Sequence, residues 1–338
     1  MPGFVDCHTH LAFPQNGTTP DNGDSAARLR AGTAARLAIR AKAHLEAMAR
    51  HGTTTVEVKT GCGPDESAET KLLRVLHGLK QDPIDVFATF FFRLPGDDVG
   101  GAHDAATDWV IDELLPKIKR RKLARFADMA WNPNPTWHNR FSRYLQAARH
   151  LGFGCRIHAD QICAGPAIRM AMEHLAVSID HLEHASASEA AMLAGGSTIA
   201  TLLPNASFWG ADPAPARALI DAGVPVALAT DFNPRDMPAM SLQAVVSLAC
   251  RHLKMTAEEA ISAATINAAH VLGRAERTGS LEPGKFADLL ILSVPDYREL
   301  ANNLGNNLVR MTMKRGEVIY QEGGVAGLTE RTPLPRAW

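Results

Sequence analysis

The chain has 338 residues and a mass of 36.4 kDa, enough for one large domain or a large domain with a small appendage. Its residues are 46% hydrophobic and 21% charged, with a formal net charge of -1, which gives no reason to expect nucleic acid or an anionic membrane as a partner. The five cysteines form no Cys-x-x-Cys motif, and no apolar run is long enough for a secretory signal or a membrane span. We therefore expect a cytoplasmic protein without disulfide bonds.

Short apolar runs alternate with helix-like stretches along most of the chain. The runs predicted as strands are 4–7, 53–59, 84–92, 123–130, 154–158, 177–181, 197–203 and 224–230. Stretches with helical spacing between them include 26–51, 67–80, 105–119, 140–151 and 214–222. Eight such units predict an α/β fold, a TIM-like (β/α)8 barrel over residues 1–275. A doubly wound open sheet is the alternative, but its usual Gly-x-Gly-x-x-Gly turn is missing.

The last part of the chain has a different pattern. Two more helices are predicted at 241–252 and 256–272, followed by a turn-rich run that leads into a strand near residue 290. Arg315-Gly316 separates two further short β runs, 308–313 and 318–320. We therefore predict a small β appendage over 276–325 and a loosely held polar tail over 326–338.

Chemically reactive side chains follow several of the predicted strands. In barrels of this kind the active site lies at the carboxyl ends of the strands. In chain order these ends offer His8 and His10, Lys59, Arg93, Trp131, His158 with Gln161 just beyond, His181, Asn205 and Asp231. We expect these side chains to meet at one rim of the barrel.

A single metal ion is the chemistry that this set of residues favours. His8 and His10 are one residue apart on an extended segment, so their side chains share a face. With His158 they supply three nitrogen donors, and Asp231 supplies an oxygen donor, a set that suits Zn²⁺ or Fe²⁺/Fe³⁺. Such a metal lowers the pKa of a bound water toward neutrality. We expect His181 to stabilise a developing oxyanion or to move a proton.

Each of these residues also has a purely structural interpretation. His158 and His181 would then be histidines at a strand end and a helix start, and Asp231 would cap a turn. Lys59 either pairs with an acid inside the barrel, Glu57 or Asp6, or is carboxylated to bridge two metals. Because the fourth strand end offers no second set of ligands, we predict one metal and a charge pair for Lys59.

Several motifs occur in the order found in one known superfamily. They lie at residues 2–13, 52–63, 157–161 (IHADQ), 178–182, 201–208, 227–234 (ALATDFNP) and 279–292. On these motifs the chain resembles the amidohydrolase superfamily of metal-dependent hydrolases, and within it the imidazolonepropionases of histidine degradation. The resemblance implies His8, His10, His158 and Asp231 as metal ligands and His181 and Asp231 as catalytic residues. It also implies that metal-bound hydroxide opens a cyclic amide or amidine.

The predicted substrate pocket departs from that pattern. An arginine expected to hold a substrate carboxylate is Gly17 here, a tyrosine is Cys62, and a histidine after the third strand is lost. Arg93 could replace the carboxylate clamp, because a guanidinium binds a carboxylate bidentately. Our candidates for substrate binding are Gln161, Arg93, Asn205, Cys62 and Trp131.

The resemblance also implies strands before the first barrel strand, which pair with the last strands in a small β-sandwich. Because this sequence starts at the first barrel strand, we expect an incomplete appendage with an unpaired edge, which a second subunit in a homodimer would cover. Two other functions stay open. One is a deaminase of the same superfamily, and the other is a metal-binding protein without turnover.

Overall fold

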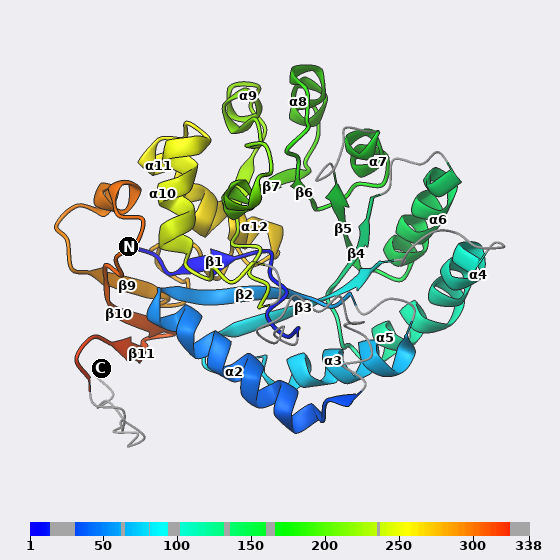
Figure 1. Cartoon of the computed structure of the whole chain (residues 1–338), viewed down its shortest axis with the longest axis horizontal. Helices are drawn as coiled ribbons and strands as arrows, with labels where there is room; N and C mark the ends of the chain where they lie inside the picture. Colours follow the sequence, from blue (N-terminus) through cyan, green and yellow to red (C-terminus); the bar gives the residue numbers. More distant parts are fainter. Residues whose placement is uncertain are drawn as a thin grey trace.

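Eight parallel strands form a barrel in the computed structural model of the chain, and helices surround it (Figure 1). The structure describes residues 1–13, 31–61, 65–80, 82–93, 102–131, 136–159, 166–234 and 237–324. The strands are hydrogen-bonded in chain order: β1 (Phe4–Asp6), β2 (Thr53–Lys59), β3 (Asp85–Phe92), β4 (Phe126–Ala130), β5 (Gly154–Ala159), β6 (Ser178–His181), β7 (Ile199–Leu202) and β8 (Val226–Leu228). The predicted (β/α)8 barrel is confirmed.

The first and eighth strands close the barrel through the residues that follow them. The Asp231 N–H donates to the His8 carbonyl at 3.1 Å, and the His10 N–H donates to the Phe232 carbonyl at 2.7 Å. Deeper in the barrel, the Asp6 carboxylate accepts bonds from the backbone N–H and the hydroxyl of Thr230 at 3.1 and 2.6 Å. Closure therefore brings the ends of β1 and β8 side by side.

The helices form the outer layer of the barrel (Figure 1). They are α2 (Ala34–Arg50), α3 (Glu66–Gly78), α4 (Ala102–Trp109), α5 (Leu115–Arg120), α6 (Thr136–His150), α7 (Ala167–Glu173), α8 (Ala187–Ala194), α9 (Ala216–Asp221), α10 (Leu242–His252), α11 (Ala257–Ser262) and α12 (Ala268–Val271). The helix predicted at 105–119 is α4 and α5 joined by a π-helical turn, Val110–Leu114. Pro116 lies just after this turn, and since proline has no N–H, it cannot continue the regular α-helical bonding there.

Local sequence signals explain where several helices begin. Ser186 and Glu189 form a reciprocal capping box at the start of α8, and Thr256 and Glu259 do the same for α11. The Asp65 side chain accepts a bond from a backbone N–H in the first turn of α3. The apolar face of each helix covers strands such as β2, which is buried along its whole length because both of its faces are covered.

A small antiparallel sheet lies beside the barrel, next to β1 and β2 (Figure 1). Its order is β11 (Glu317–Gln321), β10 (Val309–Lys314), β9 (Leu289–Leu292). The expectation of an unpaired edge was wrong at β9, because the first residues of the chain bond to it. Pro2 bridges Leu289, and the Leu290 N–H donates to the Met1 carbonyl at 2.9 Å. At the other edge, β11 has no further strand beside it within the described residues.

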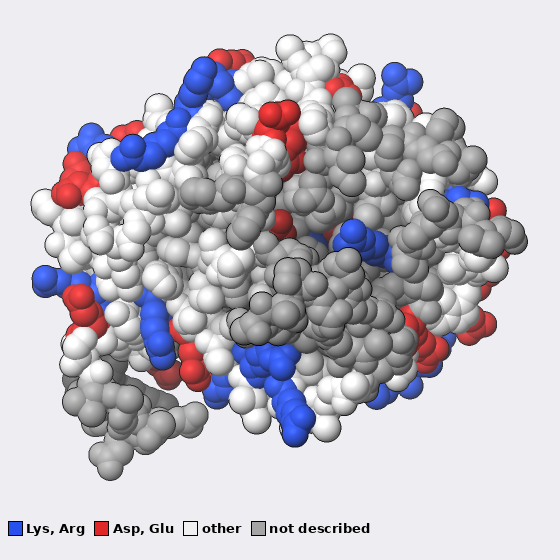
Figure 2. Space-filling model, in the orientation of Figure 1, with Lys and Arg blue, Asp and Glu red and all other residues white. Residues whose placement is uncertain are grey.

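The surface mixes both signs of charge. On the face shown in Figure 2, the described acidic and basic side chains are interspersed. No helix in the described part of the chain is long and apolar enough to cross a membrane. The predicted tail, 326–338, lies outside the described residues, and the domain boundaries at 275 and 325 stay predictions.

Candidate active site

Five predicted site residues meet at the carboxyl ends of the barrel strands. His8 and His10 follow β1, His158 lies in β5, His181 ends β6, and Asp231 follows β8. Two overlapping groups of potential ligand atoms, each within 4.8 Å of one another, are formed by His8, His158 and His181 and by His8, His10 and Asp231. His8 belongs to both groups and is therefore the centre of the cluster.

The distances within the cluster are short. Oδ1 of Asp231 lies 3.4 Å from Nε2 of His8 and 3.7 Å from Nε2 of His10. The ring centroids of His158 and His181 are 4.2 Å apart, and those of His8 and His158 are 5.2 Å apart. The other four side chains therefore all lie close to the imidazole of His8.

The donor atoms of this cluster fit a divalent metal ion. Nε2 of His8, Nδ1 of His158 and Nε2 of His181 are buried and have no hydrogen-bond partner among the described residues. Leaving a buried polar atom unpaired costs about 1–3 kcal/mol, so several such atoms around one centre indicate a missing bonding partner. Imidazole nitrogens with a carboxylate oxygen are typical ligands of zinc and of non-haem iron.

The electrostatics of the site keep three histidines neutral. Burial, together with the charge of Lys59, holds the pKa of His8 well below its usual value and lowers the pKa of His10 to about 3. Burial, together with the neighbouring His181, also holds the pKa of His158 well below its usual value. Burial raises the pKa of Asp231 to about 6. Neutral imidazoles are the form that binds a metal, so the histidines are ready to act as ligands near neutral pH.

His181 differs electrostatically from the other three. Burial lowers its pKa, but the nearby Glu183 carboxylate outweighs burial, and the net pKa of His181 is raised. Nδ1 of His181 lies 3.2 Å from Oε1 of Glu183. Glu183 was not among the site residues predicted from the sequence. The one feature of the sequence that could have indicated its role is its position two residues after His181. This pair favours a protonated His181 whose unpaired Nε2 faces the cluster.

Two residues of the cluster, His181 and Asp231, and the neighbouring Leu182 have strained backbone conformations. The φ angles of His181, Leu182 and Asp231 are 83°, 67° and 53°, in the left-handed region that non-glycine residues rarely adopt. Such conformations cost free energy and persist where the surrounding structure imposes them, which is often at active sites. Here these backbone conformations turn the chain sharply just after β6 and β8.

A fully buried group of charges lies behind the cluster, inside the barrel. Nζ of Lys59 is 2.5 Å from Asp128, 3.1 Å from Asp180 and 3.2 Å from Glu57. The predicted pairing of Lys59 with Glu57 is confirmed. The alternative pairing with Asp6 was wrong, because that carboxylate bonds to Thr230, two residues after β8. Carboxylation of Lys59 does not fit this setting, since a carbamate would face three carboxylates.

The predicted substrate-binding residues fall into three groups. Arg93 directly follows β3 and is exposed, and the half-buried Trp131 follows β4 and stacks on His138. Asn205 is buried, and its amide donates to the Thr230 carbonyl at 2.8 Å and to the Ala239 carbonyl at 3.3 Å, which links β7 to the segment after β8. Gln161 and Cys62 lie outside the described residues.

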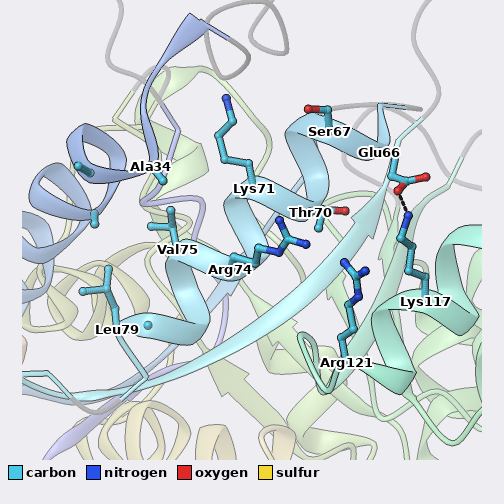
Figure 3. A pocket seen from close by; sticks show the side chains of 13 residues that line it. Ala34, Glu66, Ser67, Thr70, Lys71, Arg74, Val75, Leu79, Lys117 and Arg121 are labelled. Atoms are coloured by element: carbon cyan, nitrogen blue, oxygen red, sulfur yellow. Dashed lines mark hydrogen bonds and ion pairs between the residues drawn. The ribbon is translucent and has the colours of Figure 1, made fainter.

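A groove of about 880 Å³ lies elsewhere, between α2, α3 and α5 (Figure 3). Four cationic side chains line it, Lys71, Arg74, Lys117 and Arg121, and the two arginines point toward one another. None of the predicted site residues lines this groove. Donor chemistry, not cavity size, therefore identifies the candidate active site.

A parallel eight-stranded barrel with histidines and an aspartate at its strand ends defines the class of metal-dependent barrel hydrolases. Residues 1–319 match the Amidohydrolase family, and the chain belongs to this family. With the relatives described next, this makes it an amidohydrolase that acts on a carbon–nitrogen bond, and the family generally uses a divalent metal ion.

Among curated proteins the chain is similar to imidazolonepropionases. It is 38% identical to the imidazolonepropionase of Shouchella clausii over 365 residues, covering 99% of this chain and 79% of that protein. It is also 38% identical to the imidazolonepropionase of Geobacillus kaustophilus over 354 residues, covering 96% of this chain and 81% of that protein. The resemblance to this group that the motifs indicated is confirmed.

Solved structures share the fold. The 5-methylcytosine deaminase of Klebsiella pneumoniae with phosphonocytosine gives a TM-score of 0.74 at 18% identity, covering 98% of this chain and 88% of that chain. The N-isopropylammelide isopropylaminohydrolase of Burkholderia multivorans gives 0.73 at 16% identity, covering 94% and 85%. At these identities the comparison supports the barrel and its small sheet and nothing more specific.

Proposed function

We propose that this enzyme hydrolyses a ring C–N bond of an imidazolone-type cyclic amide, as an imidazolonepropionase of histidine degradation does. The observation that carries the proposal is the cluster of His8, His10, His158 and Asp231, with the His181–Glu183 pair beside it. The identity to curated imidazolonepropionases supports the choice of substrate class. We also propose that it acts in the cytoplasm, where its buried Cys7 and Cys155 stay reduced.

One ion, Zn²⁺ or iron, would be held by His8, His10, His158 and Asp231. When bound, such a metal activates a water molecule near neutral pH and polarises the substrate carbonyl. The three histidines can donate to it because burial keeps them neutral. The buried nitrogen atoms without partners support this assignment.

Asp231 and His181 supply the proton chemistry. The carboxylate of Asp231 accepts the proton of the attacking water and passes it to the ring nitrogen that leaves. Its place beside His8 and His10 puts the carboxylate next to the position of the attacking water. Protonated His181 donates from Nε2 to the oxygen on which negative charge develops, and Glu183 holds the ring through Nδ1.

Arg93 is the proposed partner of a substrate carboxylate. Burial is the main cause of the lowered pKa of His10, and the positive charges of Lys59, His181 and Arg93 lower it further. The guanidinium of Arg93 therefore interacts electrostatically with the cluster. Its exposed position after β3 leaves it free to contact a substrate at the rim. Gln161, Cys62, Trp131 and Asn205 stay candidates for further substrate contacts.

We also propose a homodimer that covers the outer face of the small sheet. Cross-strand register places Leu289, Ile291, Met311, Met313 and Val318 on one face, and we call these five residues the sheet patch. Ile291 and Val318 are each 46% exposed, and β11 has no further strand beside it within the described residues. An apolar face next to an open edge is typical of an interaction surface.

The test is a hydrolysis assay on purified protein whose metal content has been measured. The substrates are imidazolone propionate and a panel of other cyclic amides and amidines. Ring opening without release of ammonia supports the proposal, whereas ammonia from a ring carbon identifies a deaminase. Stoichiometric metal without hydrolysis of any substrate identifies a metal-binding protein without turnover.

A further inference from the structure

We propose that Asp180 is the residue that positions His8 for metal binding and that Arg156, Ser178 and Lys59 fix Asp180 in turn. This inference rests on the proposed metal site and adds a residue that is not itself a ligand. It concerns the affinity for the metal, not the proton transfers of the reaction.

The contact between Asp180 and His8 determines which histidine nitrogen is free. Oδ2 of Asp180 lies 2.8 Å from Nδ1 of His8, and both side chains are fully buried. A carboxylate only accepts hydrogen bonds, so Nδ1 carries the proton and Nε2 carries the lone pair. Nε2 is the atom that lies 3.4 Å from Asp231 and has no other partner among the described residues. Asp180 therefore selects the tautomer and ring orientation that a metal needs.

Asp180 is itself held from several sides. Nη2 of Arg156 donates to its Oδ1 at 3.1 Å and to its Oδ2 at 2.9 Å, and the Ser178 hydroxyl donates to Oδ1 at 2.8 Å. Nζ of Lys59 lies 3.1 Å from Oδ2. These donors occupy both carboxylate oxygens, so the carboxylate cannot turn away from His8 without breaking several bonds.

The surrounding charges connect the barrel strands. Glu57 and Lys59 are on β2, Asp128 is on β4, Arg156 is on β5 and Asp180 is on β6, and all five side chains are fully buried. Burying ion pairs costs desolvation free energy that their attraction often only offsets, so stability alone is a weak reason for such a group. A buried charge group can instead hold a ligand histidine rigidly, and for that role its fixed geometry matters more than its net contribution to stability.

Asp128 provides a matched control within the same group of charges. It is as buried as Asp180 and lies closer to Lys59, at 2.5 Å against 3.1 Å, but among the described residues no contact joins it to a proposed ligand. Asp180→Asn and Asp128→Asn therefore remove the same charge from the same group. Only the first substitution disturbs the partner of His8.

The experiment measures zinc affinity by competition with a chromophoric chelator, with folding monitored by circular dichroism. We expect Asp180→Asn to weaken zinc binding by roughly 10–100-fold and Asp128→Asn to leave it near the wild-type value, even where both lower the melting temperature. The visible spectrum of the Co²⁺-loaded protein should change in Asp180→Asn and not in Asp128→Asn. Equal zinc affinity in the two variants would overturn the inference.

A milder pair covers the case in which Asp180→Asn does not fold. Ser178→Ala removes one donor to Asp180 and leaves every charge in place, and Thr201→Val changes a buried hydroxyl on β7 that has no partner among the described residues. We expect a smaller loss of zinc affinity in Ser178→Ala and none in Thr201→Val. Unchanged affinity in Ser178→Ala would then overturn the inference. If the wild-type protein binds no zinc or iron stoichiometrically, the proposed metal site itself fails.

Discussion

Asp231 contacts His8 through both its backbone and its side chain, although Asp231 follows the last barrel strand and His8 follows the first. The Asp231 N–H donates to the His8 carbonyl at 3.1 Å, and Oδ1 of Asp231 lies 3.4 Å from Nε2 of His8. The backbone contact helps close the barrel, and the side-chain contact forms one side of the proposed metal site. Closing the barrel and building the site are therefore one structural event, so a protein that fails to close its barrel cannot bind the metal.

Removing a ligand should remove the metal. We expect His158→Ala and Asp231→Ala each to lose more affinity than the roughly 10–100-fold loss typical of residues that only support a ligand, and to lose activity with it. Metal content by plasma mass spectrometry and zinc affinity check this. His150→Ala, an exposed position on α6, is the control. Metal-loaded His158→Ala protein with full turnover would show that the ligand assignment is wrong.

Replacing His181 should separate catalysis from metal binding. His181→Ala removes the proposed donor to the oxyanion, and removal of one such donor typically costs about 10²–10³ in kcat. We expect stoichiometric metal and a loss of kcat in that range, measured by steady-state kinetics and metal analysis on the same sample. Loss of the metal would instead make His181 a ligand, as its place in one of the two donor groups permits.

Glu183 should set the alkaline limit of activity. The nearby carboxylate raises the pKa of His181 against the effect of burial, so Glu183→Gln should lower that pKa. Activity that needs protonated His181 is lost as the pH rises through its pKa, so the loss should begin at a lower pH in Glu183→Gln. The profile of kcat/KM against pH checks this, with the exposed Glu173→Gln on α7 as control. An unchanged alkaline limit would contradict the proposed protonation state.

Arg93 should matter only for substrates with a carboxylate. A hydrogen bond to a charged group contributes about 1.5–3 kcal/mol, so Arg93→Ala should lower kcat/KM by roughly 10–100-fold for imidazolone propionate. The same variant should leave the hydrolysis of an imidazolone without the carboxylate unchanged. Equal losses on both substrates would mean that Arg93 supports the fold or the metal and does not clamp the carboxylate.

The sheet patch should hold the proposed dimer together. Ile291→Lys places a charge in the middle of the patch, and burying an unpaired charge is costly, so we expect this variant to be a monomer. Light scattering after size-exclusion chromatography measures the mass. Ile39→Lys on α2, where the wild-type side chain is 72% exposed and is not part of the sheet patch, is the control. A wild-type monomer at micromolar concentration would rule the dimer out.

Sequence by itself determined the barrel and the residue types of the site. The alternation of apolar runs and helical stretches is local, and it placed His8, His10, His158, His181 and Asp231 at strand ends without knowledge of any contact. Tertiary structure decided what these residues touch. Glu183 acts on His181 through a backbone turn with unusual φ angles, and Asp180 reaches His8 across the barrel, contacts that no local pattern encodes. The pairing of Met1–Gly3 with β9 also depends on how distant segments meet. Local periodicity reports which face of a strand is buried, whereas partners across a closed barrel depend on the register and stagger of all eight strands.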